Sequence, residues 1–473
     1  MPELMIHLEN DSIKPLYEQI YSYIRENIAD GKISFGEKLP STRFLAGHLQ
    51  VSRSTVELAY EQLLSEGYIE SIPCKGYYAS DISKLYHGST KKTEETVENK
   101  FFSSEETQPK YRICFSPNQN EMQYFPYNAW RKIAKEILAQ NNPELFLAGE
   151  AAGERELREA VCKYIYHARG VNCRAEQIII GAGNEYLLIL LAQVLGSRKR
   201  VAIENPTYLQ AYRTLQSMEY TLLTISRDEN GMCMKDIYAL EPDVVYAMPS
   251  HQFPMGTVMP MKRRLQLLHW AAEGEERYII EDDHDSEFRY KGKPIPSLQG
   301  NDRNGKVIYM GTFSKSIGAA LRVSYMVLPE HLLEVYQKKC GFYSSTVPKE
   351  QQKMLTAFLN QGYFERYLNK MRGIYKGKHD LFLSLLRKEK WVHKIYGDFA
   401  GMHVLVEVDT QMSAEEIVEA VKNQGIRIYA LEEFMIPEVS KVVQKYPTLV
   451  LGYGALSGEE MLEGIGVIRG VLE

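Results

Sequence analysis

Short apolar runs that recur between longer stretches with helical spacing constrain the fold of this chain more than any other feature. They lie at residues 177–180, 200–203, 244–247, 278–280 and 306–309. Such runs are typical of strands buried on both faces, and strands that alternate with helices predict a mostly parallel sheet covered on both sides. From about residue 113 the sequence therefore predicts an α/β domain, whose ligands would gather where the strands end.

The length of the chain requires more than this one domain. At 473 residues the chain exceeds what a single core supports, so at least two domains are expected. Residues 81–112 are mostly polar and charged and show no periodicity, which predicts a flexible linker. We expect one domain at residues 12–80, this linker, and a second domain at residues 113–473.

Composition and charge indicate a cytoplasmic protein. The six cysteines are scattered without a CxxC pair, so reduced thiols are expected and a metal site is not. No apolar run reaches membrane-spanning length, and the start of the chain lacks a signal-peptide pattern. The net charge of −5 argues against broad wrapping of nucleic acid, so any DNA contact must come from a local basic face.

The first 80 residues predict three helices followed by a hairpin. The first helix, residues 14–29, has one apolar stripe at four-residue spacing. A Ser or Thr cap near Ser41 opens the second helix. The third helix has Ser54 and Glu57 in capping-box spacing and is followed by two predicted strands within residues 68–79. This order predicts a winged helix-turn-helix.

The run from residue 15 to residue 79 resembles the GntR superfamily, through LPSTRFLA at 39–46, VSRSTVELAY at 51–60 and a glycine in the wing. The resemblance implies that the third helix enters the major groove of double-stranded promoter DNA. The residues that it places at DNA are Arg43, Ser52, Arg53, Thr55, Lys75 and Gly76. Helix N-termini and Arg forks suit phosphates and base edges. A module that binds only protein stays an alternative, because residues 1–80 hold 7 Lys and Arg against 11 Asp and Glu.

Three polar motifs follow predicted strands of the second domain. The turn at 181–184 has glycines that let backbone N–H groups approach a phosphate, and a helix follows it. The carboxylates at 281–285 suit a protonated pyridine nitrogen, a metal ion or a solvated loop. Lys315 follows a Gly/Thr/Ser turn and precedes Arg322, whose fork suits a phosphate. A partly desolvated lysine of this kind presents a neutral amine that can form a Schiff base.

Together these motifs resemble fold-type I enzymes of the aminotransferase class, which use pyridoxal 5'-phosphate (PLP), over residues 113–473. The resemblance implies PLP as cofactor and a small subdomain beside the main sheet. It implies that Lys315 forms the internal aldimine and that Asp282 pairs with the pyridine nitrogen. The other cofactor contacts that it implies are Ala182, Gly183, Asn184, Tyr208, Thr312, Ser314 and Arg322.

The combination of both halves resembles the MocR/GabR family of bacterial regulators, most specifically in residues 245–256 and 281–288. The resemblance implies a PLP-dependent, ligand-responsive transcriptional regulator that senses PLP or an amino compound through an aldimine. It also implies a homodimer, arranged head to tail, with at most residual transaminase activity. Two alternatives stay open: an active aminotransferase that carries a DNA-binding module, and a regulator whose body has lost PLP and only dimerises.

Four positions decide how closely the chain follows these patterns. Phe253 stands where aminotransferases have the Asn that contacts the cofactor's phenolic oxygen, which argues against efficient turnover. His284 replaces a common Tyr; it either donates a hydrogen bond to that oxygen, as a catalytic candidate beside Lys315 and Asp282, or only packs. Gln210 replaces an Arg of GABA-responding members, so no GABA response is expected. Arg427 is either an effector carboxylate contact or an ordinary strand residue.

Overall fold

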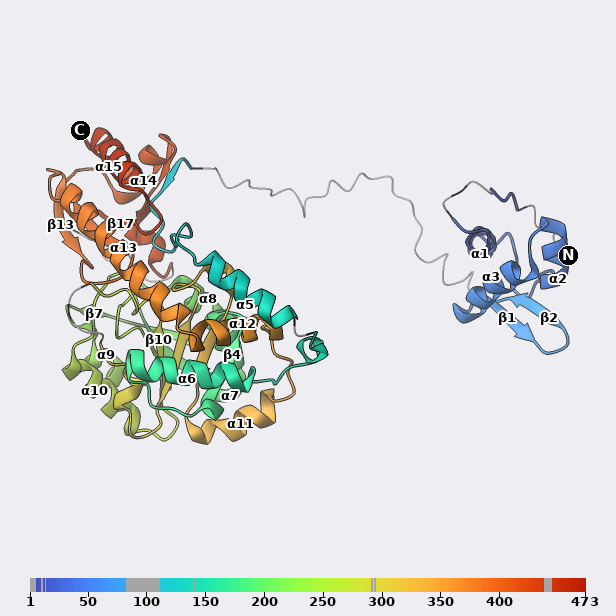
Figure 1. The fold of residues 1–473 in the computed structure, drawn as a ribbon, viewed down its shortest axis with the longest axis horizontal. Helices are drawn as coiled ribbons and strands as arrows, with labels where there is room; N and C mark the ends of the chain where they lie inside the picture. The colour runs from blue at the N-terminus through green and yellow to red at the C-terminus, as the bar shows by residue number, and fades with distance from the viewer. Residues whose placement is uncertain are drawn as a thin grey trace. The chain divides into compact units, whose positions relative to one another are not determined.

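The structure divides into two compact units, Met1–Glu106 and Thr107–Glu473. It is a computed structural model that describes residues 6–9, 12, 14–81, 111–139, 141–290, 292, 295–437 and 445–473. Most of the predicted linker lies outside the described residues. Figure 1 shows a small unit of helices and one hairpin and a large α/β unit, and each unit is described separately below.

The first unit is a winged helix-turn-helix, as the sequence predicts. Its elements are α1 (Leu16–Ala29), α2 (Thr42–Leu49), α3 (Arg53–Ser65), β1 (Ile69–Ile72) and β2 (Gly76–Ala79). The two strands pair antiparallel and form the wing. The apolar stripe of α1 is buried against α3, because residues spaced by three or four positions share one helix face.

A seven-stranded mixed sheet forms the centre of the second unit. Its strand order is β4 (Ile178–Gly181), β12 (Ser324–Val327), β11 (Val307–Thr312), β10 (Tyr278–Asp283), β9 (Val244–Ala247), β5 (Arg200–Glu204) and β6 (Thr221–Ile225). Only β12 runs antiparallel to its neighbours. The predicted α/β fold class is confirmed, and β6 and β12 are strands that the prediction did not contain.

Helices cover both faces of this sheet (Figure 1). One face packs against α7 (Asn184–Leu195), α8 (Leu209–Ser217) and α11 (Glu330–Cys340). The other face packs against α5 (Tyr127–Ala139), α6 (Arg155–Arg169), α9 (Met234–Leu240), α10 (Met261–Ala272) and α12 (Lys349–Asn360). With both faces covered, the central strands are buried throughout. No helix in the described part of the chain is both long and apolar enough to span a membrane.

A small subdomain follows the long helix α13 (Tyr363–Leu386). Its four-stranded sheet has the order β13 (Val392–Tyr396), β14 (His403–Val408), β17 (Thr448–Gly452) and β16 (Tyr429–Ala430), with helices α14 (Ala414–Lys422) and α15 (Gly458–Leu472). The short strand β15 (Ile426–Arg427) pairs with β3 (Ile113–Cys114), and β7 (Arg227–Asp228) pairs with β8 (Gly231–Met232). The 3₁₀ turns are η1 (Pro143–Phe146), η2 (Ala175–Gln177), η3 (Gln299–Asn301), η4 (Ala319–Leu321) and η5 (Leu431–Phe434).

Gly452 at the end of β17 allows the segment after β3 to pass against the subdomain. Its N–H donates to the Phe115 carbonyl at 2.9 Å, and a Cβ atom at this position would overlap the Ser116 carbonyl. We expect Gly452→Ala to lower the free energy of unfolding by about 1–3 kcal/mol, the usual result of overpacking. Thermal or urea unfolding measures the change.

The matched control is Gly466→Ala on the exposed side of α15, where a Cβ atom meets nothing within 4 Å. This change should be neutral or slightly stabilising, because Ala favours the helix over Gly. Equal stability of Gly452→Ala and wild type would show that the close approach of Ser116 is wrong.

Candidate functional site

Helix α3 presents its N-terminus with exposed polar side chains. Ser52 caps the helix, and its hydroxyl accepts from the Thr55 N–H at 3.2 Å. Arg53 is exposed, and its Nε donates to Glu57 Oε1 at 2.7 Å. The predicted capping box of Ser54 and Glu57 is therefore wrong, because Ser52 is the cap and Glu57 pairs with Arg53. A phosphate or base edge that engages Arg53 has to compete with this exposed pair, which is weak.

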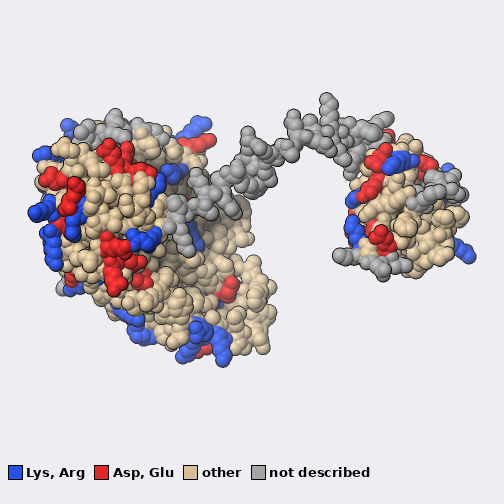
Figure 2. All heavy atoms as spheres, turned by 90° about the horizontal axis from the view of Figure 1, so that it is seen from above, with Lys and Arg blue, Asp and Glu red and all other residues tan. Residues whose placement is uncertain are grey.

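The other predicted DNA contacts lie at the start of α2 and at the tip of the wing. Arg43 is exposed in the first turn of α2, and Lys75 is exposed in the turn between the wing strands. Gly76 has φ +111°, a backbone conformation that L side chains rarely adopt. In Figure 2 acidic and basic side chains are interspersed on the visible face, so the predicted DNA contacts depend on a few individual cations.

A pocket lies where β10 and β11 end and where α7 begins. Every predicted cofactor residue except Ala182 lines it, and the other lining residues are Asn118, Glu185, Met248, Phe253, His284 and Ser324. The strands bring these residues together because the carboxyl ends of parallel strands meet at one edge of a sheet. The structure thus gathers residues that are up to 206 positions apart, from Asn118 to Ser324.

Lys315 lies in this pocket, shortly after β11. Its Nζ donates to Asn118 Oδ1 at 2.5 Å, and the Asn120 amide donates to the carbonyls of Ser314 and Lys315 at 2.9 and 3.0 Å. Burial lowers the pKa of the Lys315 amine to about 8, although the charge of Asp285 acts in the opposite direction. A substantial fraction of this amine is therefore neutral near physiological pH, as a nucleophile requires.

Asp282 is the carboxylate of the acidic cluster that faces the pocket. The Asn184 amide donates to its Oδ1 at 3.2 Å, and the Tyr246 hydroxyl donates to its Oδ2. Burial raises the pKa of Asp282 to about 7, and the Tyr246 hydrogen bond acts against this rise. A cation placed beside Asp282 would restore its charge, so the position suits a protonated ring nitrogen.

Asp283 faces the opposite side of β10, because side chains alternate along a strand. Arg169 Nε donates to its Oδ2 at 2.6 Å, and the Tyr309 hydroxyl donates to the same oxygen at 2.7 Å. Burial acts to raise the pKa of Asp283, but the Arg169 charge and the hydrogen bonds from Ser286, Tyr309 and Arg169 together hold that pKa below its usual value. Asp283 is therefore a structural residue of the buried layer.

His284 lies between Phe253 and Asp285. Its ring packs edge-to-face on Phe253 at 5.9 Å, and its Nε2 lies 3.4 Å from Asp285 Oδ1. Burial lowers the pKa of His284, so its neutral form is favoured. His251, His284 and Asp285 are the one group in the described residues with ligand atoms mutually within 4.8 Å, the spacing that a metal site requires, but His251 Nδ1 is within 2.9 Å of both Asp285 oxygens. The two roles predicted for His284, a hydrogen bond to the cofactor's phenolic oxygen and packing alone, both stay predictions.

The turn before α7 has the features of a phosphate cradle. Gly183 has φ +105°, and a Cβ atom there would overlap the Arg322 guanidinium. Arg322 Nη2 donates to the Ala182 carbonyl at 3.3 Å and to Glu185 at 2.7 Å. The buried Ser314 Oγ and Asn184 Oδ1 have no hydrogen-bond partner among the described residues. Unsatisfied polar atoms beside Lys315 and Asp282 fit a polar cofactor such as PLP.

Comparison with known proteins reproduces the division into two units. Residues 16–78 match the model of bacterial regulatory proteins of the gntR family, and residues 113–443 match aminotransferase class I and II. The HTH-type transcriptional regulator YdeL of Bacillus subtilis (strain 168) is 40% identical, with 96% of each chain covered. The probable rhizopine catabolism regulatory protein MocR of Rhizobium meliloti is 30% identical, with 98% of this chain and 95% of that protein covered. This chain belongs to the MocR-type HTH transcriptional regulators.

The solved structures that resemble this MocR-type regulator include aminotransferases. An archaeal alanine:glyoxylate aminotransferase superimposes with a TM-score of 0.68 at 26% identity, covering 76% of this chain and 90% of that one. Pyrococcus horikoshii kynurenine aminotransferase gives a TM-score of 0.67 at 24% identity, covering 77% and 91%. These likenesses support the fold-type I architecture of the second unit.

Three residues beside the pocket of the MocR-type chain were not predicted from its sequence. Asn118 accepts a hydrogen bond from Lys315, and Tyr246 donates one to Asp282. The Thr346 hydroxyl accepts from the Ala182 N–H at 3.0 Å. A tyrosine within a strand and an isolated Asn or Thr belong to no local sequence pattern. The sequence of this chain alone therefore does not identify these three residues as part of the site.

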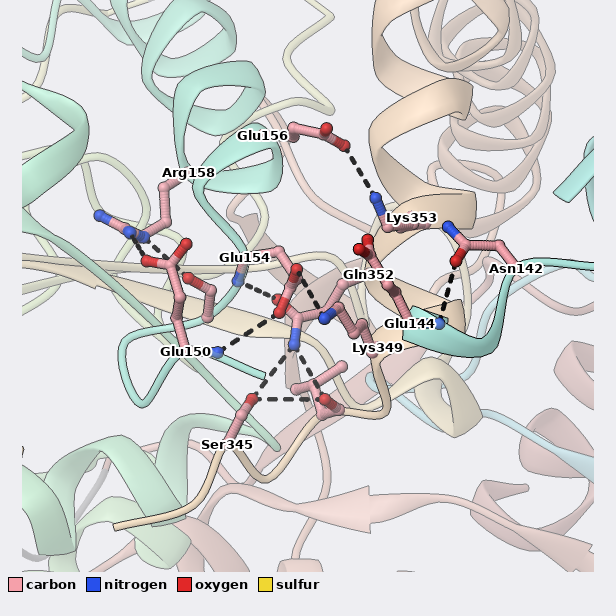
Figure 3. A network of polar contacts seen from close by, with 12 residues as sticks. Asn142, Glu144, Glu150, Glu154, Glu156, Arg158, Ser345, Lys349, Gln352 and Lys353 are labelled. Carbon is pink, nitrogen blue, oxygen red and sulfur yellow. Dashed lines mark hydrogen bonds and ion pairs between the residues drawn. The ribbon is translucent and has the colours of Figure 1, made fainter. Parts of the chain in front are cut away.

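The loop that carries Thr346 is braced by a polar network (Figure 3). Gln352 Oε1 accepts from the Glu154 N–H at 2.8 Å, and Gln352 Nε2 donates to Ser345 Oγ at 3.1 Å. Lys349 lies 3.7 Å from the Glu154 carboxylate. These contacts join the start of α12 to the start of α6 and hold Thr346 beside the turn that precedes α7.

Arg427 does not line the pocket. Its Nη2 forms an ion pair with Glu433, and its Nη1 donates to the Ile428 carbonyl at 2.8 Å. Tyr208 does line the pocket; its hydroxyl donates to Gln210 at 2.7 Å and its ring packs edge-to-face on Phe253 at 6.1 Å. The predicted roles of these residues stay predictions.

Proposed function

We propose that this MocR-type regulator binds PLP in the Lys315 pocket and changes its affinity for promoter DNA when PLP, or an amino compound that reacts with it, is bound. One observation carries the proposal. Lys315, Asp282 and the turn that precedes α7 line one pocket, although they come from distant parts of the sequence. A relative from Corynebacterium glutamicum, 27% identical, is a pyridoxine biosynthesis transcriptional regulator, which supports a ligand of the vitamin B6 class.

The pocket residues have separate roles in this proposal. When bound, PLP supplies an aldehyde carbon that condenses reversibly with amines. Lys315 offers the neutral amine that anchors the cofactor, and Asp282 holds the charge of the pyridine nitrogen. Gly183, Asn184, Ser314 and Arg322 would hold the phosphate, with Thr312 and Ala182 beside them, and Tyr208 would stack on the ring.

The DNA-binding half rests on the GntR-type helix-turn-helix. Ser52, Arg53 and Thr55 at the start of α3 would contact phosphates or bases in the major groove, with Arg43 on the backbone. Lys75 and Gly76 of the wing would approach the minor groove. We include a head-to-tail homodimer in the proposal, because paired modules would read two half-sites.

An active aminotransferase is the second candidate. The lowered pKa of Lys315 favours it, since an amine with a pKa of about 8 can accept and return a proton. Phe253 at the position of the aminotransferase Asn opposes it. Rapid formation of a keto acid from an amino acid and an acceptor would favour the enzyme over the sensor.

A mobility-shift assay with DNA from the protein's own promoter region tests the proposed function. We expect the affinity of the full chain to differ between the cofactor-free and the PLP-loaded protein by about tenfold, a typical coupling between two sites. The same affinity in both states would exclude PLP as a regulatory ligand. Binding of the promoter no tighter than of a scrambled fragment would refute sequence-specific recognition.

A further inference from the structure

A groove separate from the Lys315 pocket lies between the start of α5 and the start of α13 (Figure 1). Its volume is about 780 Å³, which is within the range of small-molecule sites. Its walls are the loop that precedes α5, the first turns of α5 and one face of α13. None of its lining residues lines the Lys315 pocket, so the proposed function gives this groove no role.

The groove is basic, although the chain as a whole has a net charge of −5. Its charged lining residues are Lys132, Arg366 and Lys370, and none of the described residues that line it is Asp or Glu. Glu365 adjoins Arg366 in the sequence but does not line the groove. Lys132 lies 3.8 Å from Glu136 in an exposed pair, and Arg366 and Lys370 form no ion pair with any described residue. An anion can therefore use all three cations at little cost.

Aromatic rings alternate with these cations. One face of α13 supplies four lining residues at the spacing i, i+3, i+4 and i+7, which are Tyr363, Arg366, Tyr367 and Lys370. The Arg366 guanidinium lies over the Tyr363 ring at 4.8 Å, and the Lys370 amine lies over the Tyr124 ring at 5.1 Å. Tyr127, on the opposite wall, is 55% exposed. A flat guanidinium and an exposed phenol ring are both surfaces on which a nucleobase stacks.

Two helices begin at this groove. Tyr127 is the first residue of α5 and Tyr363 is the first residue of α13, and both line it. The first N–H groups of a helix have no partner within the helix, and the helix dipole favours negative charge beside them. Three cations and two helix N-termini together favour a ligand with several negative charges, such as a diphosphate or a triphosphate.

We propose that this groove is a second ligand site of the regulator and that it binds a nucleoside diphosphate or triphosphate. The cations and the helix N-termini hold the phosphates, and the base stacks on Arg366 or Tyr127. Inorganic phosphate or an acidic peptide would use the cations but would leave these stacking surfaces without a role. The bases of a DNA duplex are already stacked on one another, so the rings favour a free nucleotide over promoter DNA.

The test measures the binding of ATP, GTP, CTP and UTP to the full-length protein by isothermal titration calorimetry, beside adenosine and inorganic tripolyphosphate. We expect at least one nucleoside triphosphate to bind about tenfold more tightly than either adenosine or tripolyphosphate, because each of these two compounds keeps only part of the contacts. Tripolyphosphate that binds as tightly as every nucleotide would show a site for anions only. That result overturns the proposal, and so does the absence of binding by all four nucleotides.

Three variants locate the nucleotide in the groove. Arg366→Gln combined with Lys370→Gln should weaken binding of the triphosphate about 10- to 100-fold, because two cationic partners of the phosphates are lost. Tyr127→Ala should weaken nucleotide binding about tenfold and leave tripolyphosphate binding nearly unchanged, because it removes only a stacking surface. Lys376→Gln is the matched control. It removes the same charge from an exposed position of α13 outside the groove and should keep the wild-type affinity.

Three further results would overturn the proposal. An unchanged affinity in the double variant would mean that the nucleotide binds elsewhere on the chain. Equal weakening by Lys376→Gln would mean a diffuse attraction to the charge of α13. A single-stranded oligonucleotide that binds more tightly than any nucleotide would identify a nucleic-acid groove instead. These results do not depend on the proposed function, because nucleotide binding is measured as heat and PLP uptake as visible absorbance.

Discussion

Replacing Lys315 with alanine should abolish the visible absorption band that we expect of the wild-type protein after reconstitution with PLP. The band requires a covalent link to the cofactor, and Lys315 is the one lysine among the described residues that line the pocket. We expect complete loss of the band and release of the cofactor on gel filtration, with the circular dichroism spectrum unchanged. Lys338→Ala, on the exposed side of α11, is the matched control and should keep the band.

The pH dependence of the rate of PLP uptake is a second test of the role of Lys315. Because burial lowers the pKa of Lys315 to about 8, its neutral fraction rises between roughly pH 7 and pH 9 and then saturates. The uptake rate of wild type should follow this curve. A rate that still rises in proportion to hydroxide above pH 9 would point to an ordinary exposed lysine instead. A visible band in Lys315→Ala would disprove the assignment directly.

Arg53→Ala should weaken promoter binding about 10- to 100-fold, the range expected for one Arg contact to a base edge. Arg53 is exposed at the N-terminus of α3, where a helix presents its side chains to the major groove. When Arg53 binds DNA, the one interaction that it has to give up is its exposed ion pair with Glu57. Titration of labelled promoter DNA at fixed salt measures the change.

Lys32→Ala is the control for the DNA experiment. Lys32 is exposed in the turn after α1 and pairs with Asp30, so its loss removes the same charge away from the recognition helix. We expect at most a small change in affinity. If Arg53→Ala binds the promoter as tightly as wild type, α3 is not the recognition helix.

The fold was predictable where a strand is a continuous apolar run. The five predicted strands coincide with β4, β5, β9, β10 and β11, all of which lie inside the sheet or at its β4 edge. β6 was missed because this edge strand is only partly buried and contains two threonines. β12 was missed because it follows β11 without an intervening helix and runs antiparallel, which breaks the alternation of strand and helix.

The site was predictable only where its chemistry is local in the sequence. Glycines beside a helix start, a carboxylate at a strand end and a lysine in a Gly/Thr/Ser turn are short patterns with direct physical meaning. The bond between Asn118 and Lys315 spans 197 residues, and that between Ala182 and Thr346 spans 164. Such contacts exist only after the chain has folded, and no spacing rule contains them.

The capping of α3 shows the limit of spacing rules at short range. Ser54 and Glu57 have the separation of a capping box, which would start the helix at Thr55, but the helix starts two residues earlier, at Arg53. Ser52 therefore caps the helix, and Glu57 is free to pair with Arg53 four residues before it. The pattern identified the helix but placed its first turn wrongly.

Because side chains alternate along β10, the side chains that face the pocket depend on the register of this strand. A shift of β10 by one residue would turn Glu281 and Asp283 toward the pocket. It would turn Asp282 toward the opposite face of the sheet. In that layer Arg169 bonds Asp283 and, at 2.5 Å, the Ser250 hydroxyl. A slip that moved His284 into the place of Asp283 would leave this buried guanidinium without its carboxylate, which is strongly unfavourable. Arg169, which does not line the pocket, thus favours the register of β10 in which Asp282 faces the pocket.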